Sequence, residues 1–455
     1  MAILAEHTDR VTRFIVAPDH TFFLTGSDDG TVKVWDSARL ERNVTHRSRQ
    51  TYKLAPGVKV TSLCFVETTY TFVCTGSDGT VHVVKVDVSE TANTTKYGKL
   101  RNLREWQIPP SAAGNEHAIW SEHYRGDAAS TLVLATNLGR ILATDLRYMT
   151  TILEFQNPAQ HGTATCFCIG RKRDWLLIGT DHGVLDLWDL RFRMRLRSWT
   201  FPQAAPITRL QLHPSKKTAR RNRVCVSGGA GRGEVTVWDI EKTICHEIYR
   251  PAHADGKDRL HLRDYELRNV DDERADNFLS RVAGSIAADA NISEAASSAP
   301  AVTTSLHFGL QQTSEDTETL HAFAVTGGPD AKLRFWDCER LEGCRLVSGG
   351  APDEKPTYTF SQLGLDTRVL TEKTAYAEPP SASTAVESSR VAPKRAASTR
   401  TGVGSGKTSR YETIRTSAQR LLQGHLDAIT DVAVLERPFG MVVSADRSGQ
   451  VFVHQ

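Results

Sequence analysis

Four residues near the start of the chain have side chains that could do chemistry together: His7, Thr25, Asp29 and Trp35. An Asp–His pair that reaches a hydroxyl is an arrangement that can activate a nucleophile. The same residue types can instead form a buried scaffold, because a buried indole N–H needs an acceptor and a buried carboxylate needs donors. We favour the scaffold over a catalytic pair, since the phrase that contains these residues recurs along the chain.

A glycine-rich stretch at 402–408 nearly matches the loop that cradles phosphates in nucleotide-binding proteins. That motif requires a glycine five residues before Gly406, where this chain has Thr401. It also needs a strand before it and a helix after it. Here the surrounding sequence is of low complexity, so we do not expect a nucleotide site.

Composition narrows the function classes. The 455 residues carry a net charge of +3, so charge gives no reason to predict nucleic-acid binding. The sequence shows no apolar run of membrane-span length and no signal-peptide pattern. The eight cysteines are scattered without zinc spacing, so we expect buried, reduced thiols in a cytosolic protein, with no metal and no cofactor.

The element that positions the first four residues is a phrase that recurs seven times. Its first copy reads Thr-Gly-Ser-Asp-Asp-Gly-Thr-Val-Lys-Val-Trp-Asp over 25–36. Asp-Gly makes a tight turn, because glycine tolerates positive φ, and Val32 and Val34 alternate with Lys33 as in a half-buried strand. This phrase is the signature of the WD40 repeat, with one copy in each four-stranded blade of a propeller.

The copies predict an all-β fold, a seven-bladed WD40 β-propeller that forms a single domain over 1–455. Measured at the Trp position, successive copies lie 49, 60, 44, 50, 98 and 118 residues apart. A blade needs only about 40–45 residues. The last two gaps therefore contain long insertions, at about 252–302 and 351–417.

The two insertions differ in composition. The first has the period of an amphipathic helix over 272–288, with Phe278 on the apolar face. We interpret it as a satellite helix on a flexible tether, or as a partner-binding helix. The second alternates hydrophobically over 356–373, which predicts some order. Residues 375–409 have too few apolar side chains to form a core, so most of this insertion is expected to be disordered.

The copies are also uneven. Tryptophan stands at 35, 188, 238 and 336, whereas the other three positions hold Val84, Thr144 and His454. We expect the blades with these replacements to lack the full polar network. The last copy ends in its third strand, so the few residues before His7 must supply the strand that closes the ring. This closure looks clipped, and we expect more sequence before Met1 in the native context.

Two short stretches could bind partners. The basic run at 216–223 could contact anionic lipid or nucleic-acid phosphates, although a solvated loop is favoured. Trp-Asp-Leu-Arg at 188–191 is similar to the box by which some propellers dock to the adaptor of a cullin ubiquitin ligase. A substrate receptor of such a ligase, contacting the adaptor through Arg191, is therefore the alternative function.

Phrases between the repeats resemble one family. They include Thr-His-Arg-Ser-Arg-Gln-Thr-Tyr at 45–52, Leu-Trp-Asp-Leu-Arg-Phe at 187–192, Lys-Leu-Arg-Phe-Trp-Asp at 332–337 and Gly-His-Leu-Asp-Ala-Ile-Thr-Asp-Val at 424–432. As an ordered set, they are similar to the C-terminal propeller of the regulatory subunit of class III phosphatidylinositol 3-kinase. That subunit is the protein-kinase-like, vacuolar protein sorting member of the complex.

The resemblance implies a non-catalytic scaffold, in a complex with the lipid kinase catalytic subunit and coiled-coil subunits, active in autophagy and in endosomal and vacuolar sorting. It also implies a cytoplasmic protein, peripheral on endosomal, autophagic and Golgi membranes through the complex. This chain has no kinase motifs and no helical repeats, so we expect no enzyme activity, and it is either a fragment or a separately encoded propeller. Candidate partner contacts are Arg47, Arg49 and Tyr52 in an exposed loop over 47–52 after the first blade, Phe278 in the predicted helix, and Arg191.

Overall fold

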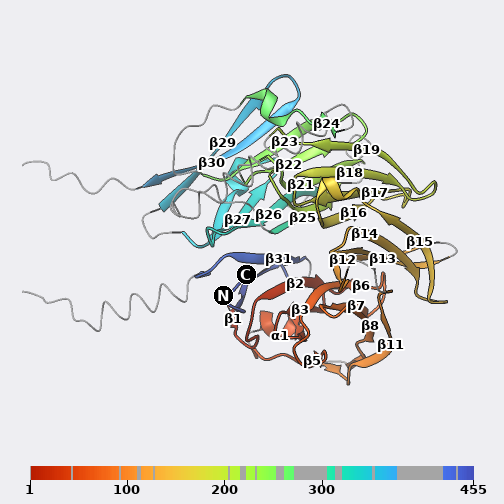
Figure 1. Ribbon diagram of the computed structural model, residues 1–455. Helices are drawn as coiled ribbons and strands as arrows, with labels where there is room; N and C mark the ends of the chain where they lie inside the picture. The colour runs from red at the N-terminus through yellow and green to blue at the C-terminus, as the bar shows by residue number, and fades with distance from the viewer. Residues whose placement is uncertain are drawn as a thin grey trace, which may run out of the picture.

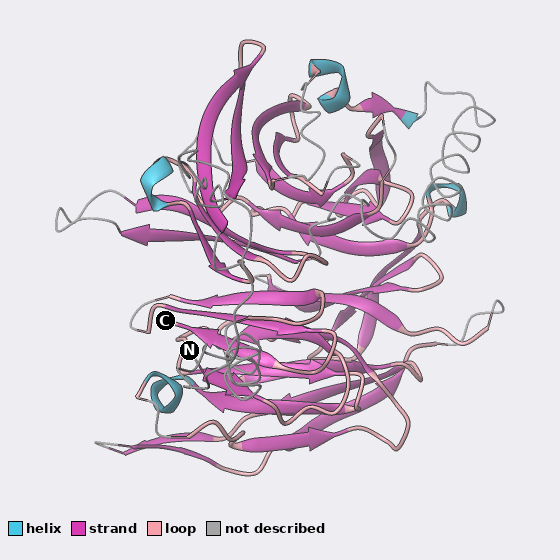
Figure 2. Cartoon of the chain, turned by 90° about the vertical axis from the view of Figure 1, so that its left-hand side faces the viewer, coloured by secondary structure: helices cyan, strands magenta, loops and turns pink. Residues whose placement is uncertain are grey.

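Strands make up most of the described chain and form seven sheets of four or more strands, with one separate two-stranded sheet. Figures 1 and 2 show this mainly β architecture. The computed structural model describes residues 2–42, 45–91, 94–109, 114–126, 129–202, 205–215, 222–230, 233–252, 261–270, 305–312, 320–350, 354–376, 424–436 and 439–455. The innermost strands contact one another in a closed cycle, in the order β2, β6, β12, β16, β20, β25, β31 and β2 again. The seven-bladed propeller is confirmed.

The first three blades are four-stranded antiparallel sheets. Blade one consists of β2 (Val11–Val16), β3 (Phe22–Ser27), β4 (Thr31–Asp36) and β5 (Gln50–Lys53). Blade two consists of β6 (Val60–Phe65), β7 (Thr71–Gly76), β8 (Thr80–Lys85) and β11 (Arg101–Gln107). Blade three consists of β12 (Ala118–Arg125), β13 (Ser130–Thr136), β14 (Arg140–Asp145) and β15 (Thr150–Gln156).

The next three blades follow the same plan. Blade four has β16 (Ala164–Ile169), β17 (Trp175–Thr180), β18 (Val184–Asp189) and β19 (Met194–Thr200). Blade five has β20 (Ile207–Leu212), β21 (Arg223–Gly228), β22 (Val235–Asp239) and β23 (Ile244–Arg250). Blade six has β25 (Ser305–Gln312), β26 (Leu320–Gly327), β27 (Leu333–Asp337) and β28 (Arg345–Ser348).

Short elements decorate the blades. Blade two carries the hairpin β9 (Val88–Thr91) and β10 (Thr94–Tyr97) between its third and fourth strands. Blade one carries the helix α1 (Ser37–Glu41), whose first turn is capped by the Asp36 side chain accepting from the Arg39 N–H. Single 3-10 turns occur at η1 (Ala159–His161), η3 (Leu262–Tyr265) and η5 (Leu341–Gly343).

The two ends of the chain meet in blade seven, which closes the ring. Its strands β31 (Ile429–Leu435), β32 (Met441–Asp446) and β33 (Val451–His454) come from the end of the chain. The fourth strand is β1 (Ala2–Leu4), which pairs antiparallel with β33 and places Leu4 opposite Val451. Figure 1 shows the N and C marks side by side. The residues before His7 therefore supply the missing strand, as the sequence predicted.

Both insertions return to the outer edges of neighbouring blades. From the first, β24 (Arg268–Asn269) pairs with the end of β19 in blade four. From the second, β29 (Glu354–Leu363) and β30 (Thr367–Tyr376) form a hairpin, and β30 adds to β23 of blade five in parallel. Tyr265 and Val369 are buried in the same apolar cluster. The order predicted over 356–373 is therefore present, as an extension of a blade.

The Asp-Gly turn of blade one needs its glycine. Gly30 has a φ of 76°, and a Cβ at this position would lie 2.5 Å from the carbonyl oxygen of Val58. A side chain would therefore be strained and would also clash with the next blade. This close approach lets the turn pack against the neighbouring sheet while Asp29 points inward.

Candidate functional site

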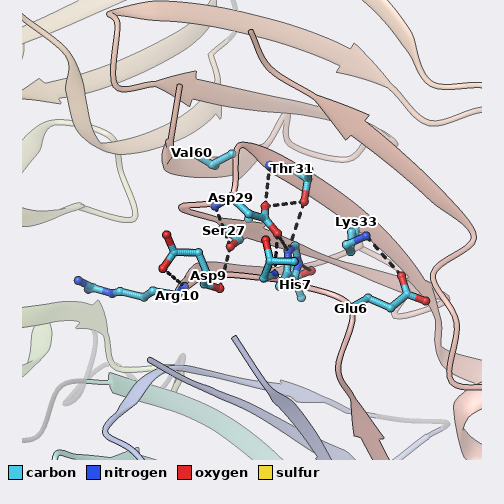
Figure 3. A network of polar contacts seen from close by, with 12 residues as sticks. Glu6, His7, Asp9, Arg10, Ser27, Asp29, Thr31, Lys33 and Val60 are labelled. Atoms are coloured by element: carbon cyan, nitrogen blue, oxygen red, sulfur yellow. Dashed lines mark hydrogen bonds and ion pairs between the residues drawn. The ribbon is translucent and has the colours of Figure 1, made fainter. Parts of the chain in front are cut away.

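The structure brings His7, Thr25, Asp29 and Trp35 into one hydrogen-bonded chain. Figure 3 shows the His7 and Asp29 side chains of this chain, with Thr31 beside them. The indole Nε1 of Trp35 donates to Thr25 Oγ1 over 2.9 Å, and Thr25 Oγ1 lies 2.7 Å from His7 Nε2. The other ring nitrogen, Nδ1, lies 2.9 Å from Asp29 Oδ2. A consistent proton assignment has Nδ1–H donating to Asp29 and the Thr25 hydroxyl donating to Nε2.

This arrangement suits a scaffold, because its hydroxyl is not available for reaction. Thr25 is fully buried and His7 is nearly so, and Thr25 Oγ1 already has two partners. Desolvation raises the pKa of Asp29, but hydrogen bonds from His7, Thr31 and the Thr8 N–H outweigh it and hold that pKa well below its usual range. The carboxylate is therefore charged and fixed, and it joins the turn to the irregular segment before β2 that contains His7 and Thr8.

Blade seven contains the same chain with a histidine in place of the tryptophan. Asp446 Oδ2 lies 3.0 Å from His425 Nδ1, and His425 Nε2 lies 2.7 Å from Ser444 Oγ. His454 Nε2 completes the chain at 3.5 Å from Ser444 Oγ. The prediction that this blade lacks the network is therefore wrong. Burial lowers the pKa of His454 to about 4, so its neutral ring can donate an N–H as indole does.

Blade four uses a different carboxylate. His161 Nδ1 lies 2.9 Å from Asp186 Oδ1, and Asp186 is in the third strand rather than in the turn. Asn157 bridges the network, since its amide donates to Asp186 over 2.9 Å and its Oδ1 accepts from Trp188 Nε1 over 3.2 Å. The Leu-Asp-Leu-Trp sequence of β18 could have indicated this network. It places a carboxylate two residues before the tryptophan, and residues two apart lie on the same face of a strand.

Blades five and six contain buried arginines that the sequence did not single out. In blade five, Arg250 Nε lies 3.0 Å from Glu234 Oε1. In blade six, Arg334 lies between Asp330 and Glu372, with N–O distances of 2.7 and 2.6 Å. Glu372 belongs to the second insertion, so a residue far along the chain completes this blade. Sequence spacing offers no signal for this pair.

Side chains from alternate blades meet across the propeller axis. The guanidinium carbon of Arg13 lies 3.4 Å from the ring centroid of Trp120, and that of Arg209 lies 5.0 Å from it. Arg209 also pairs with Asp431 over 3.1 Å. Burial, and then the charge of Arg209, lowers the pKa of Arg13 to about 9. These inward-facing residues lie on β2, β12, β20 and β31, so the cluster connects blades one, three, five and seven.

Among the predicted partner-contact residues that the structure describes, Arg47, Arg49 and Tyr52 belong to blade one and Arg191 belongs to blade four. Residues 50–52, expected in a loop after blade one, are instead part of its fourth strand, since Gln50 pairs with Val34 and Tyr52 with Val32. Arg47 is exposed and Arg49 is half-buried. The hydroxyl of Tyr52 lies 3.1 Å from His82 Nδ1 in blade two. The loop was misplaced because the fourth strand has no motif of its own.

Other predicted features lie outside the described residues. They are Phe278 with its predicted helix over 272–288, the glycine-rich stretch at 402–408, the low-complexity part of the second insertion over 377–409, and residues 216–221 of the basic run. Within the described residues, no helix is long and apolar enough to cross a bilayer. The same part of the chain has no group of three His, Cys, Asp or Glu side chains that could hold a metal ion.

Arg191, the residue of the Trp-Asp-Leu-Arg box, is paired within its own turn. Its Nη2 lies 2.8 Å from Asp189 Oδ2. Blade three repeats this arrangement, with Arg147 Nη2 3.1 Å from Asp145 Oδ2. The Asp–Arg pair is therefore a recurring turn structure, and the box by itself does not single out blade four.

A cavity of about 690 Å³ lies between blades six and seven. Its lining includes apolar side chains, Phe323 and Phe335 from blade six and Val434 and Val442 from blade seven. The same lining includes the charged residues Arg340, Arg345, Glu342 and Glu436. Volumes of this size suit small ligands, but the charges here have both signs and favour no one class.

Comparisons with known proteins agree with this geometry. The family model for the WD domain, G-beta repeat, matches residues 1–36. A VPS15-type serine/threonine-protein kinase of Komagataella pastoris is 24% identical over 99% of this chain and 30% of its own length. The VPS15 kinase of Saccharomyces cerevisiae is 28% identical over 54% of this chain and 17% of its own, and that of Arabidopsis thaliana is 25% identical over 81% and 24%.

The chain thus spans less than a third of the length of these curated relatives. In this chain, the matched sequence forms the seven blades, and the two ends of the chain pair to close the ring. Fold, repeat match and relatives together identify the chain as a WD-repeat propeller of the VPS15 type.

Proposed function

We propose that this propeller is a non-catalytic scaffold module in a class III phosphatidylinositol 3-kinase assembly, where it contacts the catalytic subunit and coiled-coil subunits. The observation that carries the proposal is the match to a VPS15-type kinase of Komagataella pastoris over 99% of the chain, together with the propeller that this chain forms. Propellers usually bind partners on exposed surfaces, and function must be argued from such surfaces rather than from the fold.

The scaffold role also agrees with the chemistry of the buried polar groups. The His–Asp networks of blades one, four and seven are enclosed, with His7, His161 and His425 all buried. Groups in such positions hold blades together and cannot reach a substrate. We place the assembly in the cytoplasm, peripheral on endosomal, autophagic and Golgi membranes, with roles in autophagy and in endosomal and vacuolar sorting.

The test is reconstitution. The full chain is mixed with the purified lipid kinase catalytic subunit and the coiled-coil subunits of the same organism, and complexes are separated by size-exclusion chromatography. We expect a stable complex with at least one of them. As a control, Leu4→Asp places a charge in the closing strand and should abolish binding by opening the propeller. Separate elution of the wild-type chain from every subunit would contradict the proposal.

A further inference from the structure

The exposed apolar side chains gather on one part of the propeller rim. Eleven large apolar side chains are exposed in the described part of the chain. Six of them belong to the outer strands of blades two, three and four or to the turns that precede those strands: Leu103, Tyr148, Ile152, Phe192, Met194 and Leu196. We call this set the outer rim. Exposed apolar patches of this kind mark interaction sites.

Two hydrogen bonds show that the outer rim is continuous. Arg104 of blade two donates from Nη2 to the carbonyl oxygen of Arg147 in blade three, over 3.3 Å. Arg193 of blade four donates from Nη2 to the carbonyl oxygen of Ile152 in blade three, over 2.9 Å. The three blades are therefore in contact where the apolar side chains emerge.

The most exposed members of the rim are two aromatic rings in equivalent turns. Tyr148 is 74% exposed and Phe192 is 71% exposed. Each follows an arginine that pairs with the aspartate two residues before it, and the guanidinium carbon lies 5.4 Å from the ring centroid in both turns. In each turn, the Asp–Arg pair holds the guanidinium beside the ring, which restricts the aromatic side chain. Little side-chain entropy is therefore lost when a partner covers the ring.

The residue composition of the outer rim favours a protein partner with acidic side chains. Residues 189–197 contain four arginines and one aspartate, and Arg193 and Arg197 are exposed. The three rim segments at 101–107, 145–156 and 189–197 contain no lysine. Arginine, aromatic residues and methionine without lysine are the composition of protein–protein interfaces, whereas a surface for anionic lipid would use lysine as readily.

We propose that the outer rim docks a partner helix whose apolar stripe is flanked by Asp and Glu. The stripe would cover Tyr148 and Phe192, and the carboxylates would pair with Arg193 and Arg197. Both aromatic rings stand out at turns, so a helix lying across the blades fits better than a peptide inserted into a pocket. This inference rests on the proposed scaffold function and assigns the surface through which that function acts.

The test uses the full chain, with the purified coiled-coil subunits of the lipid kinase assembly as the probe. Binding is measured by isothermal titration calorimetry at two salt concentrations. Tyr148→Ala combined with Phe192→Ala should raise Kd at least tenfold. Arg193→Glu combined with Arg197→Glu should raise it at least as much and should remove most of the salt dependence.

Matched controls lie elsewhere on the surface. Leu365→Ala removes a side chain that is 91% exposed on the β29–β30 hairpin. Lys53→Glu combined with Lys373→Glu reverses two exposed charges away from the rim. Both controls should leave Kd within twofold. Thermal unfolding is measured for every variant, because Arg193 also donates to the carbonyl oxygen of Ile152. Arg197→Glu alone leaves that bond in place and should still weaken binding.

The outcomes separate the two proposals. Wild-type binding that the rim variants do not weaken would overturn the docking surface and leave the scaffold function standing. Wild-type chain that binds none of the subunits would overturn both. If the rim variants instead lose binding to phosphatidylserine-containing vesicles and keep full affinity for the subunits, the rim is a lipid surface and the helix inference is wrong.

Discussion

Glu372 in β30 lies 2.6 Å from the Nε atom of Arg334 in β27, so the second insertion supplies a buried carboxylate to the sixth blade. The two side chains are 1% and 5% exposed. The same carboxylate accepts from the backbone N–H of Ala252, where blade five ends. One residue of an insertion therefore joins two neighbouring blades and fixes the hairpin against them.

Removing this carboxylate should destabilise the whole domain. Glu372→Ala leaves Arg334 buried with Asp330 as its remaining anionic partner. Breaking a buried ion pair from one side costs about 3 kcal/mol, because the other charge stays desolvated. Urea unfolding should show that loss in the free energy of unfolding. Asp366→Ala, an exposed acid in the same hairpin, should change it by less than about 0.5 kcal/mol.

The network of blade one should depend on a single hydroxyl. Thr25→Val removes both the acceptor for Trp35 and the partner of His7, and it leaves a buried indole N–H without its bond. We expect a loss of about 2–3 kcal/mol in the free energy of unfolding. Thr150→Val, on the exposed edge of β15, should be close to neutral when measured by the same unfolding curves. Equal effects of the two changes would show that the network adds no stability.

Closure of the ring should depend on the short first strand. Leu4 is 1% exposed and packs in the apolar cluster between blades seven and one. Leu4→Ala should lower the free energy of unfolding by about 3 kcal/mol through lost burial and the cavity left behind. Leu426→Ala is the control, since Leu426 lies near blade seven but is 61% exposed. If both variants melt at the wild-type temperature, β1 does not hold the propeller closed.

Glu122 should make stability fall as the pH rises. Desolvation on the axis-facing strand β12 raises the pKa of Glu122 to about 7, above its unfolded value of 4.5. The folded state therefore binds more protons than the unfolded state between these values, and unfolding free energy is lost as the pH rises through about 7. The loss is at most about 3 kcal/mol.

Glu122→Gln tests this sign directly. The amide keeps an acceptor for Trp120 Nε1 and cannot ionise. The difference in unfolding free energy between variant and wild type should grow in favour of the variant from pH 5 to pH 8. Glu342→Gln, at an exposed position, should show no such trend. A constant difference across this range would mean that Glu122 ionises normally in the folded protein.

Much of the blade plan could be predicted from local sequence. The turn and strand of each copy are short-range features, since Asp-Gly and the alternation of Val32 and Val34 act over a few residues. The hydrogen-bonded network of blade one can also be predicted locally, because Thr25, Asp29 and Trp35 all belong to the first copy of the repeated phrase. The network of blade seven does not follow from the repeat phrase, because the phrase has tryptophan as the donor, whereas in this blade the neutral ring of His454 carries the N–H.

By itself, the sequence determined the all-β class, the number of blades, the two insertions and the need for the first residues to complete the last blade. Only the tertiary structure decided which distant side chains meet: Glu372 with Arg334, Arg13 with Trp120, and the two aromatic turns of the outer rim. The physical reason is the separation in sequence over which each interaction acts. Turns and strand periods depend on neighbours in sequence, whereas ion pairs and exposed patches depend on how the blades are placed around the axis.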